Sequence, residues 1–135
     1  MTVANLAKAP MISIIDDDEA VREATKGLIR SLGYSAAAFA SAEEFLHSDR
    51  VKDTSCLITD VQMPGMNGVE LQERLIADGR RTKVIFMTGF SEEKVRARAL
   101  KAGAIGFLKK PFDDARLIEC LDRALGGDSS QSPVQ

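Results

Sequence analysis

The sequence predicts an α/β protein in which five parallel strands form one sheet and five helices cover its faces. Short apolar runs alternate with longer segments whose apolar residues recur at every third or fourth position, and this alternation repeats five times. The apolar runs contain few polar residues, which is typical of strands that are buried on both faces of a parallel sheet.

The first two strand and helix units are predicted in the first third of the chain. Met11–Ile15 is the first strand, and Gly33 ends the amphipathic helix that follows it. Ser35–Phe39 is a weaker, alanine-rich strand. Ser41 and Glu44 have the spacing of a capping box, in which the serine caps the second helix and the glutamate reaches back to the cap.

The other three units follow the same plan. Asn67 is suited to cap the third helix and Ser91 the fourth. Gly79 and Gly103 are expected to end these two helices. A regular apolar stripe predicts the last helix, up to Leu125. The remaining strands are expected at residues 55–59, 83–88 and 105–108.

Length and composition indicate one domain. The 135 residues include 44% hydrophobic side chains, enough for a buried core, which we expect at 11–125. An N-terminal tail is expected at 1–10, and a flexible C-terminal tail, rich in Gly, Ser and Gln, at 126–135. The net charge of -2 does not favour nucleic-acid binding, no apolar run can span a membrane, and residues 1–10 do not resemble a signal peptide. We therefore expect a cytoplasmic protein that binds neither nucleic acid nor a membrane.

Polar side chains stand where four of the predicted strands end. Asp16 and Asp17 follow the first strand, Asp60 follows the third, Thr88 ends the fourth, and Lys110 follows the fifth. The carboxyl ends of parallel strands meet at one edge of the sheet, where α/β proteins bind their ligands. We therefore expect three carboxylates, one hydroxyl and one ammonium group at a common site.

This combination of groups suits the transfer of a phosphoryl group to an aspartate. Three close carboxylates repel one another unless a cation joins them, and Mg²⁺ is held by carboxylates, waters and phosphate oxygens. Asp60 is the expected nucleophile. Lys110 would neutralise charge, while Thr88 would donate a hydrogen bond to the phosphoryl group. Because Lys109 and Lys110 point to opposite sides of the strand, only one of them should reach the site.

Four segments together resemble the response regulator receiver domain, which has the CheY-like fold. The resemblance extends over about Ile12–Leu125, nearly the whole predicted domain. The stretches Asp16–Arg22, Ser41–Leu46 and Lys110–Asp114 are similar to those in the receivers of nitrogen-fixation and nodulation regulators. The four segments are Ile14–Asp18, Thr59–Gly68, Met87–Gly89 and Phe107–Phe112.

The resemblance implies a flavodoxin-like sheet with the strand order 2-1-3-4-5. It identifies Asp60 as the phosphoacceptor and Asp16 and Asp17 as the acidic pair that binds Mg²⁺. The main-chain carbonyl of Gln62 would complete the metal shell. The implied phosphoryl donor is a sensor histidine kinase or a histidine phosphotransfer protein.

The resemblance also implies a conformational switch. Thr88 matches the switch hydroxyl, Phe107 matches the switch aromatic residue, and Lys110 matches the lysine of the family. Phosphorylation would change the surface of the fourth helix, fifth strand and fifth helix, where a downstream protein target or a second copy of the chain binds. Phe90 would partly shield the phosphoryl group from water.

Several whole-protein functions are compatible with this reading. We expect a single-domain regulator that acts by protein contact and that is no enzyme beyond its own phosphorylation and dephosphorylation. The alternative is the receiver part of a transcription factor, because regulators of this type usually carry a C-terminal DNA-binding helix-turn-helix. A purely structural adaptor would keep the fold without being phosphorylated.

Two other classes that share parts of the pattern fit less well. An aspartyl-phosphate phosphatase of the haloacid dehalogenase class needs a second aspartate two residues after the nucleophile, where this chain has Gln62. A flavodoxin-like flavin binder needs a Ser-, Thr- and Gly-rich phosphate loop after the first strand. Here that loop is Asp16–Glu19, whose charges would repel a phosphate.

Overall fold

The structure is a computed structural model that describes residues 9–89 and 92–131. The predictions made for Phe90 and Ser91 lie outside these residues. The strands are β1 (Met11–Ile15), β2 (Ser35–Phe39), β3 (Thr54–Asp60), β4 (Lys83–Thr88) and β5 (Gly106–Lys109). The helices are α2 (Glu19–Ser31), α3 (Ala42–Leu46), α4 (Gly68–Ala77), α5 (Glu93–Lys101) and α6 (Asp114–Gln131).

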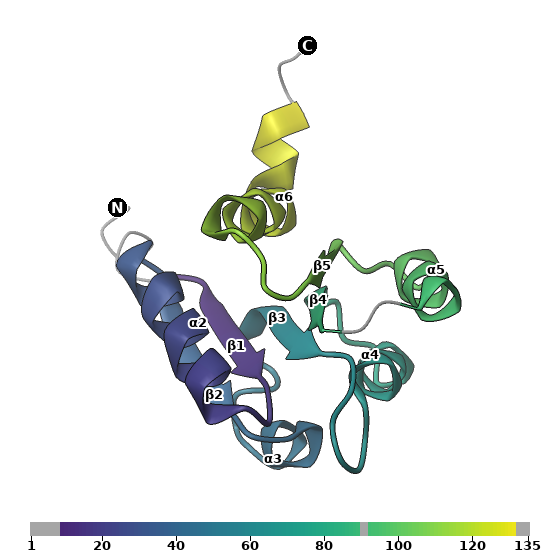
Figure 1. The fold of residues 1–135 in the computed structure, drawn as a ribbon. Coiled ribbons are helices and arrows are strands. Elements are labelled where there is room, and N and C mark those ends of the chain that lie inside the picture. Colours follow the sequence, from purple (N-terminus) through teal and green to yellow (C-terminus); the bar gives the residue numbers. More distant parts are fainter. Residues whose placement is uncertain (1–8, 90–91, 132–135) are drawn as a thin grey trace.

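The five strands form one parallel sheet in the order β2-β1-β3-β4-β5, which confirms the predicted fold class and strand order. Helices α2 and α6 cover one face of the sheet, and α3, α4 and α5 cover the other (Figure 1). Since every strand runs the same way, the carboxyl ends of all five strands lie at one edge. Among the described residues, no helix is both long and apolar enough to cross a bilayer.

Two apolar layers hold the helices on the sheet. Neighbouring residues of a strand point to opposite faces, so Ile58 packs toward α2 and α6, whereas Leu57 packs toward α3, α4 and α5. In the layer on the side of α3, α4 and α5, the rings of Phe39 and Phe45 meet edge to face with centroids 5.4 Å apart. Phe45 is fully buried and fixes the short helix α3 to the sheet.

The apolar layer between the sheet and helices α2 and α6 depends on a close approach between β5 and α6. A Cβ atom on Gly106 would lie 2.5 Å from Sγ of Cys120, so glycine is the residue that lets the helix pack this near to the strand. Cys56 and Cys120 are both buried and reduced. Burial raises the pKa of the Cys56 thiol to about 12, which keeps it protonated at neutral pH.

The predicted helix caps are confirmed at two positions. Asn67 and Glu70 form a reciprocal capping box at the start of α4. The Ser41 hydroxyl accepts the Glu44 N–H, as predicted for α3. The other half of the capping box predicted at Ser41 is wrong, because the Glu44 carboxylate accepts the N–H of Ala40 and not that of Ser41.

The last two helices differ from the sequence-based prediction at their ends. The N-cap residue of α5 is Glu92, and its side chain makes no capping hydrogen bond. Helix α6 continues through residues 126–131, which were predicted to belong to a flexible tail. Glycine disfavours a helix by only about 1 kcal/mol per residue, so the pair at 126–127 permits the helix to continue.

Candidate functional site

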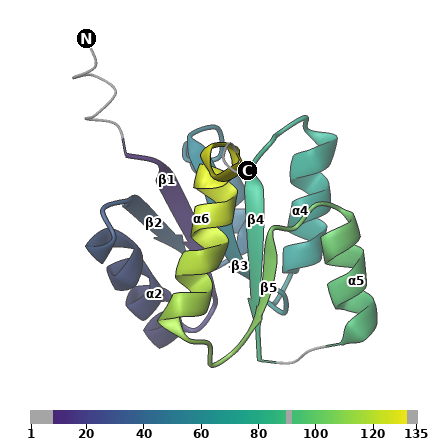
Figure 2. The same ribbon diagram turned by 90° about the horizontal axis from the view of Figure 1, so that it is seen from above.

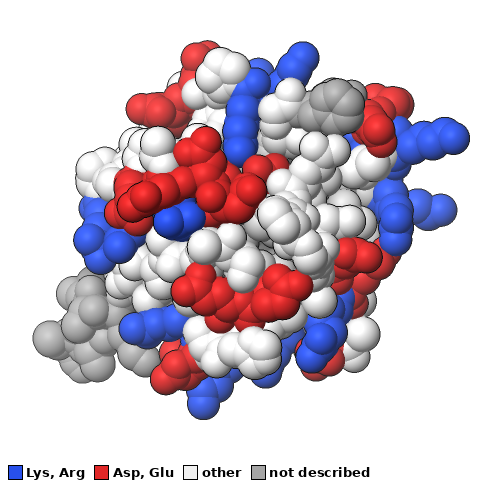
Figure 3. Space-filling model, turned by 60° about the horizontal axis from the view of Figure 1, so that its bottom comes forward, with Lys and Arg blue, Asp and Glu red and all other residues white. Residues whose placement is uncertain are grey.

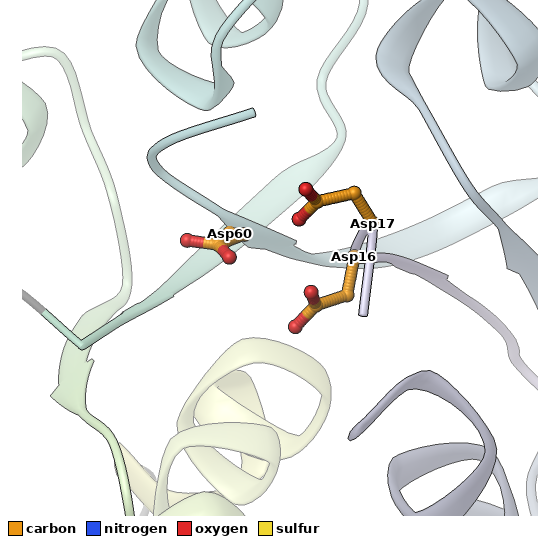
Figure 4. Close-up of side chains that lie close together, drawn as sticks. All are labelled: Asp16, Asp17 and Asp60. Atoms are coloured by element: carbon orange, nitrogen blue, oxygen red, sulfur yellow. The ribbon is translucent and has the colours of Figure 1, made fainter. Parts of the chain in front are cut away.

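The three predicted carboxylates meet at the carboxyl edge of the sheet. Asp16 and Asp17 follow β1, and Asp60 is the last residue of β3, the neighbouring strand. One carboxylate oxygen from each residue lies within 4.8 Å of the other two. Figure 4 shows the carboxyl groups of Asp16 and Asp17 extending toward the side of Asp60. Asp16 and Asp60 are buried, whereas Asp17 is exposed at the rim.

Lys110 joins two of these carboxylates. Its Nζ donates hydrogen bonds to Oδ2 of Asp16 at 2.8 Å and to Oδ2 of Asp60 at 3.0 Å. Lys109 is exposed, so Lys110 is the lysine that reaches the site. The Lys110 N–H also donates to the carbonyl of Thr88 at 2.6 Å, and the Lys110–Pro111 peptide is cis. Strand β4 therefore helps to place the lysine.

The two predicted switch residues lie on the two strands next to the site. Thr88 is the last residue of β4 and is buried, one position beyond Met87, which pairs with Asp60 in the sheet. Phe107 is partly buried in β5. Its ring packs against that of Phe86, its partner in the sheet, with centroids 5.8 Å apart.

Main-chain hydrogen bonds hold the two loops of the site. Oδ1 of Asp16 accepts the Asp18 N–H at 2.9 Å, and Oδ1 of Asp60 accepts the Gln62 N–H at 3.2 Å. Arg22 donates from Nη1 to the carbonyl of Asp16 at 2.8 Å. Arg22 was not predicted to belong to the site, because a lone arginine in the first turn of a helix resembles any other surface charge.

Burial and charge act in opposite directions at this site. Burial raises the pKa of Asp60, and this effect outweighs the hydrogen bond from Lys110. Burial also disfavours the charged form of Lys110, but its hydrogen bonds to Asp16 and Asp60 dominate, so the pKa of Lys110 is raised. The site therefore keeps its ammonium group and holds the Asp60 carboxylate at a cost in free energy.

The donor set fits a small hard cation. Asp16, Asp17 and Asp60 present oxygen atoms alone, from two buried residues and one at the rim, and Mg²⁺ prefers such ligands together with water. Acidic side chains gather in groups on the face shown in Figure 3. A divalent cation would relieve the repulsion among them.

The chain matches one known family over most of its length. Residues 12–122 match the family model of the response regulator receiver domain, and this range lies within the domain predicted at 11–125. The chain belongs to this family. The match covers the three clustered aspartates, Thr88 and Lys110.

Relatives and solved structures agree with the assignment. The chain is 42% identical over 120 residues to the transcriptional regulatory protein FixJ of Azorhizobium caulinodans, covering 89% of this chain and 57% of that protein. It is 35% identical over 125 residues to nodulation protein W of Bradyrhizobium diazoefficiens, covering 93% and 55%. The chemotaxis protein CheY4 of Vibrio cholerae has the same fold, with a TM-score of 0.78 at 24% identity, covering 87% of this chain and 99% of that one.

The resemblance to nitrogen-fixation and nodulation receivers and the CheY-like fold are therefore confirmed. Receiver domains are parts of two-component response regulators, act as phosphoacceptor switches, and typically bind Mg²⁺ at an acidic pocket. The chain spans about half the length of these two relatives.

Proposed function

We propose that Asp60 accepts a phosphoryl group from a phosphohistidine of a sensor histidine kinase or a histidine phosphotransfer protein. The observation that supports this proposal most directly is the cluster of Asp16, Asp17 and Asp60 with Lys110 bonded to two of its members. A carboxylate oxygen of Asp60 attacks phosphorus, an acyl phosphate P–O bond forms, and the P–N bond breaks. The electron pair of that bond stays on the imidazole nitrogen.

Each residue of the site has a proposed part in this transfer. Asp16, Asp17, Asp60 and the main-chain carbonyl of Gln62 would hold Mg²⁺, which neutralises charge on the phosphoryl oxygens. Lys110 adds a second positive charge next to the acceptor oxygen. Because Asp18 and Gln62 donate their N–H groups to Asp16 and Asp60, the carboxylates are oriented before the phosphoryl group arrives.

The proposed output is a change of surface on α5, β5 and α6. The Thr88 hydroxyl would move to a phosphoryl oxygen, and the Phe107 ring would follow it inward. Helices α4 and α5 lie side by side (Figure 2), joined by Arg98 with Glu73 and by Gln72 Nε2 with the Ala99 carbonyl at 3.2 Å. A downstream protein or a second copy of the chain would bind the changed surface.

Two whole-protein roles follow from this switch. The sequence alone favoured a single-domain regulator that acts by protein contact. The relatives favour the other role, because FixJ of Azorhizobium caulinodans is a transcriptional regulatory protein of which this chain spans 57%. We therefore propose that the chain acts as the receiver of a transcriptional regulator, with the single-domain regulator as the second candidate.

The test is the intact mass of the chain after incubation with Mg²⁺ and acetyl phosphate. The wild-type chain and Asp53→Asn, which removes an exposed carboxylate elsewhere, should each gain one phosphoryl group. Asp60→Asn should gain none, and EDTA should prevent the gain in every variant. A phosphoryl group on Asp60→Asn, or none on the wild-type chain, would refute the assignment of Asp60.

A further inference from the structure

A glutamate outside the carboxylate cluster contacts the loop that follows the proposed phosphoacceptor. Glu43 lies in the first turn of α3, and its Oε2 accepts the N–H of Met66 at 2.8 Å, across 23 positions of sequence. Met66 belongs to the loop between β3 and α4, here called the 61–67 loop, which also contains Gln62. This hydrogen bond lowers the pKa of Glu43, so the side chain is a carboxylate at neutral pH.

The turn of the loop lies directly against this carboxylate. Gly65 has a φ of +77°, and a Cβ atom there would lie 2.6 Å from Oε2 of Glu43. The carboxylate of Glu43 therefore occupies the space that any other side chain at position 65 would need. The glycine and the glutamate together form one contact, in which the loop folds over the end of α3.

The two ends of the loop are held by other groups. Val61 donates its N–H to the Met87 carbonyl at 3.2 Å, and Gly68 donates to the Val61 carbonyl at 2.9 Å. Within the described residues, the bond from Glu43 is the one hydrogen bond made by the main chain of 63–66. The Met63 side chain is buried in the layer beneath the loop, and Glu43 adds the hydrogen bond that holds the main chain at Met66.

Helix α3 gives this contact a rigid support. Ser41 caps the helix, and Ala42 and Phe45 are fully buried beneath it. Glu43 itself is exposed, so its carboxylate can be changed without opening the core. Glu44, the next residue, binds the Ala40 N–H at 2.6 Å and makes no such contact with the loop.

We infer that Glu43 is a positioning residue for the metal site, which holds the 61–67 loop so that the Gln62 carbonyl is presented to Mg²⁺. The inference rests on the proposed function, because that function makes Gln62 a metal ligand. It explains why a charged side chain outside the carboxylate cluster contacts the turn. It assigns no contact between Glu43 and the metal or the phosphoryl group.

The first measurement is the exchange rate of the Met66 amide proton, followed by NMR without metal. Glu43→Ala removes the acceptor, so the exchange should become several-fold faster. Glu43→Gln keeps a carbonyl acceptor of the same reach and should retain most of the protection. Glu44→Ala is the matched control from the same helical turn, and it should leave the Met66 amide unchanged.

The second measurement is the Mg²⁺ dissociation constant, determined by calorimetry on the same four proteins. Residues that support metal ligands typically change affinity by roughly tenfold or more when removed, so we expect Glu43→Ala to weaken binding by roughly tenfold. Glu43→Gln should restore most of the affinity, and Glu44→Ala should bind as the wild-type chain does. Gly65→Ala should weaken binding while Glu43 is still present, because the new Cβ displaces the carboxylate.

The outcomes separate this inference from the proposed function. If the wild-type chain binds Mg²⁺ and gains a phosphoryl group, but Glu43→Ala leaves the affinity unchanged, Glu43 has no positioning role and the function stands. An equal loss in Glu44→Ala would also overturn the inference, because it would indicate a general effect of α3. If the wild-type chain does not bind Mg²⁺, the proposed function and the role of Glu43 are both wrong.

Discussion

The apolar layers of the molecule and the carboxyl edge of its sheet are built on opposite principles. The layers bury side chains such as Phe45, Leu57 and Ile58 completely, and burial of this kind is the main stabilising contribution to a fold. The edge buries Asp16 and Asp60, two groups with a large desolvation cost, and in the described part of the chain Lys110 is the one cation paired with them. The layers are arranged for stability, whereas the edge keeps charge in place at the expense of stability.

Because of this difference, the free energy of unfolding and the phosphorylation chemistry can be changed separately. A substitution in a layer should lower the free energy of unfolding and leave the phosphorylation of folded molecules unchanged. Replacing the Asp60 carboxylate at the edge should remove chemistry and leave stability equal or higher, because Lys110 keeps its pair with Asp16. The four predictions below test this separation, in order of decreasing effect on the free energy of unfolding.

The largest effect is expected from Phe45→Ala in the layer beneath α3. Phe45 is fully buried and packs against Phe39, so its removal leaves a cavity, and we expect a loss of about 3–5 kcal/mol in urea unfolding. Ile76→Ala is the control, because Ile76 is an exposed apolar residue. At saturating Mg²⁺, which offsets any weaker metal binding caused by a change in α3, the folded fraction of Phe45→Ala should still gain a phosphoryl group. A loss of phosphorylation under these conditions would refute the separation between layer and edge.

An intermediate effect is expected where α6 meets β5. Gly106→Ala places a Cβ atom against Sγ of Cys120, and overpacking of this kind typically costs about 1–3 kcal/mol. Cys120→Ala removes the sulfur, so the double variant should recover part of the loss beyond the sum of the single effects. Urea unfolding of the four proteins measures this coupling, and simple additivity would contradict the proposed contact.

A stabilising effect is expected from Asp60→Asn at the edge. The pKa of Asp60 is raised in the folded state, so the folded chain binds this proton more tightly than the unfolded chain does. The buried charge therefore costs stability at neutral pH. In EDTA at pH 7, we expect the variant to be more stable than the wild-type chain, on the order of 1 kcal/mol.

The pH dependence gives the control for this prediction. The advantage of Asp60→Asn should shrink as the pH falls from the raised pKa of folded Asp60 toward the ordinary carboxyl pKa of 3.8. It should disappear below 3.8, where Asp60 is protonated in both the folded and the unfolded state. Asp53→Asn, at an exposed position, should change stability little at any pH. A variant Asp60→Asn that unfolds more easily than the wild-type chain at pH 7 would show that the edge contributes to stability after all.

The smallest effect is expected at the ion pair between α4 and α5. The side chains of Arg98 and Glu73 are both well exposed, so Arg98→Ala should change the free energy of unfolding by less than about 1 kcal/mol. Added salt should reduce the difference further. A larger loss of stability would show that this surface pair stabilises the fold as the apolar layers do, which would contradict the prediction.

Much of the fold could be predicted because the relevant signals are local. Strand β1 and strand β4 have the predicted bounds, and the cap at Asn67 was visible in the order of residues around it. The gathering of Asp16, Asp17 and Asp60 also followed, because strands that run in parallel end at one edge. Periodicity and strand direction are enough for such predictions.

Features that depend on the path of loops and on the depth of burial became visible only in the tertiary structure. The sequence alone did not show that Asp16 and Asp60 are buried while Asp17 is exposed, or that Glu44 binds Ala40. The contact between Glu43 and Met66 joins a side chain to a main-chain N–H, which every residue but proline has, so no pattern of side chains marks it. The order of residues and the direction of the strands were enough to predict which groups meet at the edge. Only the packing of loops and helices around that edge determined how each group is held.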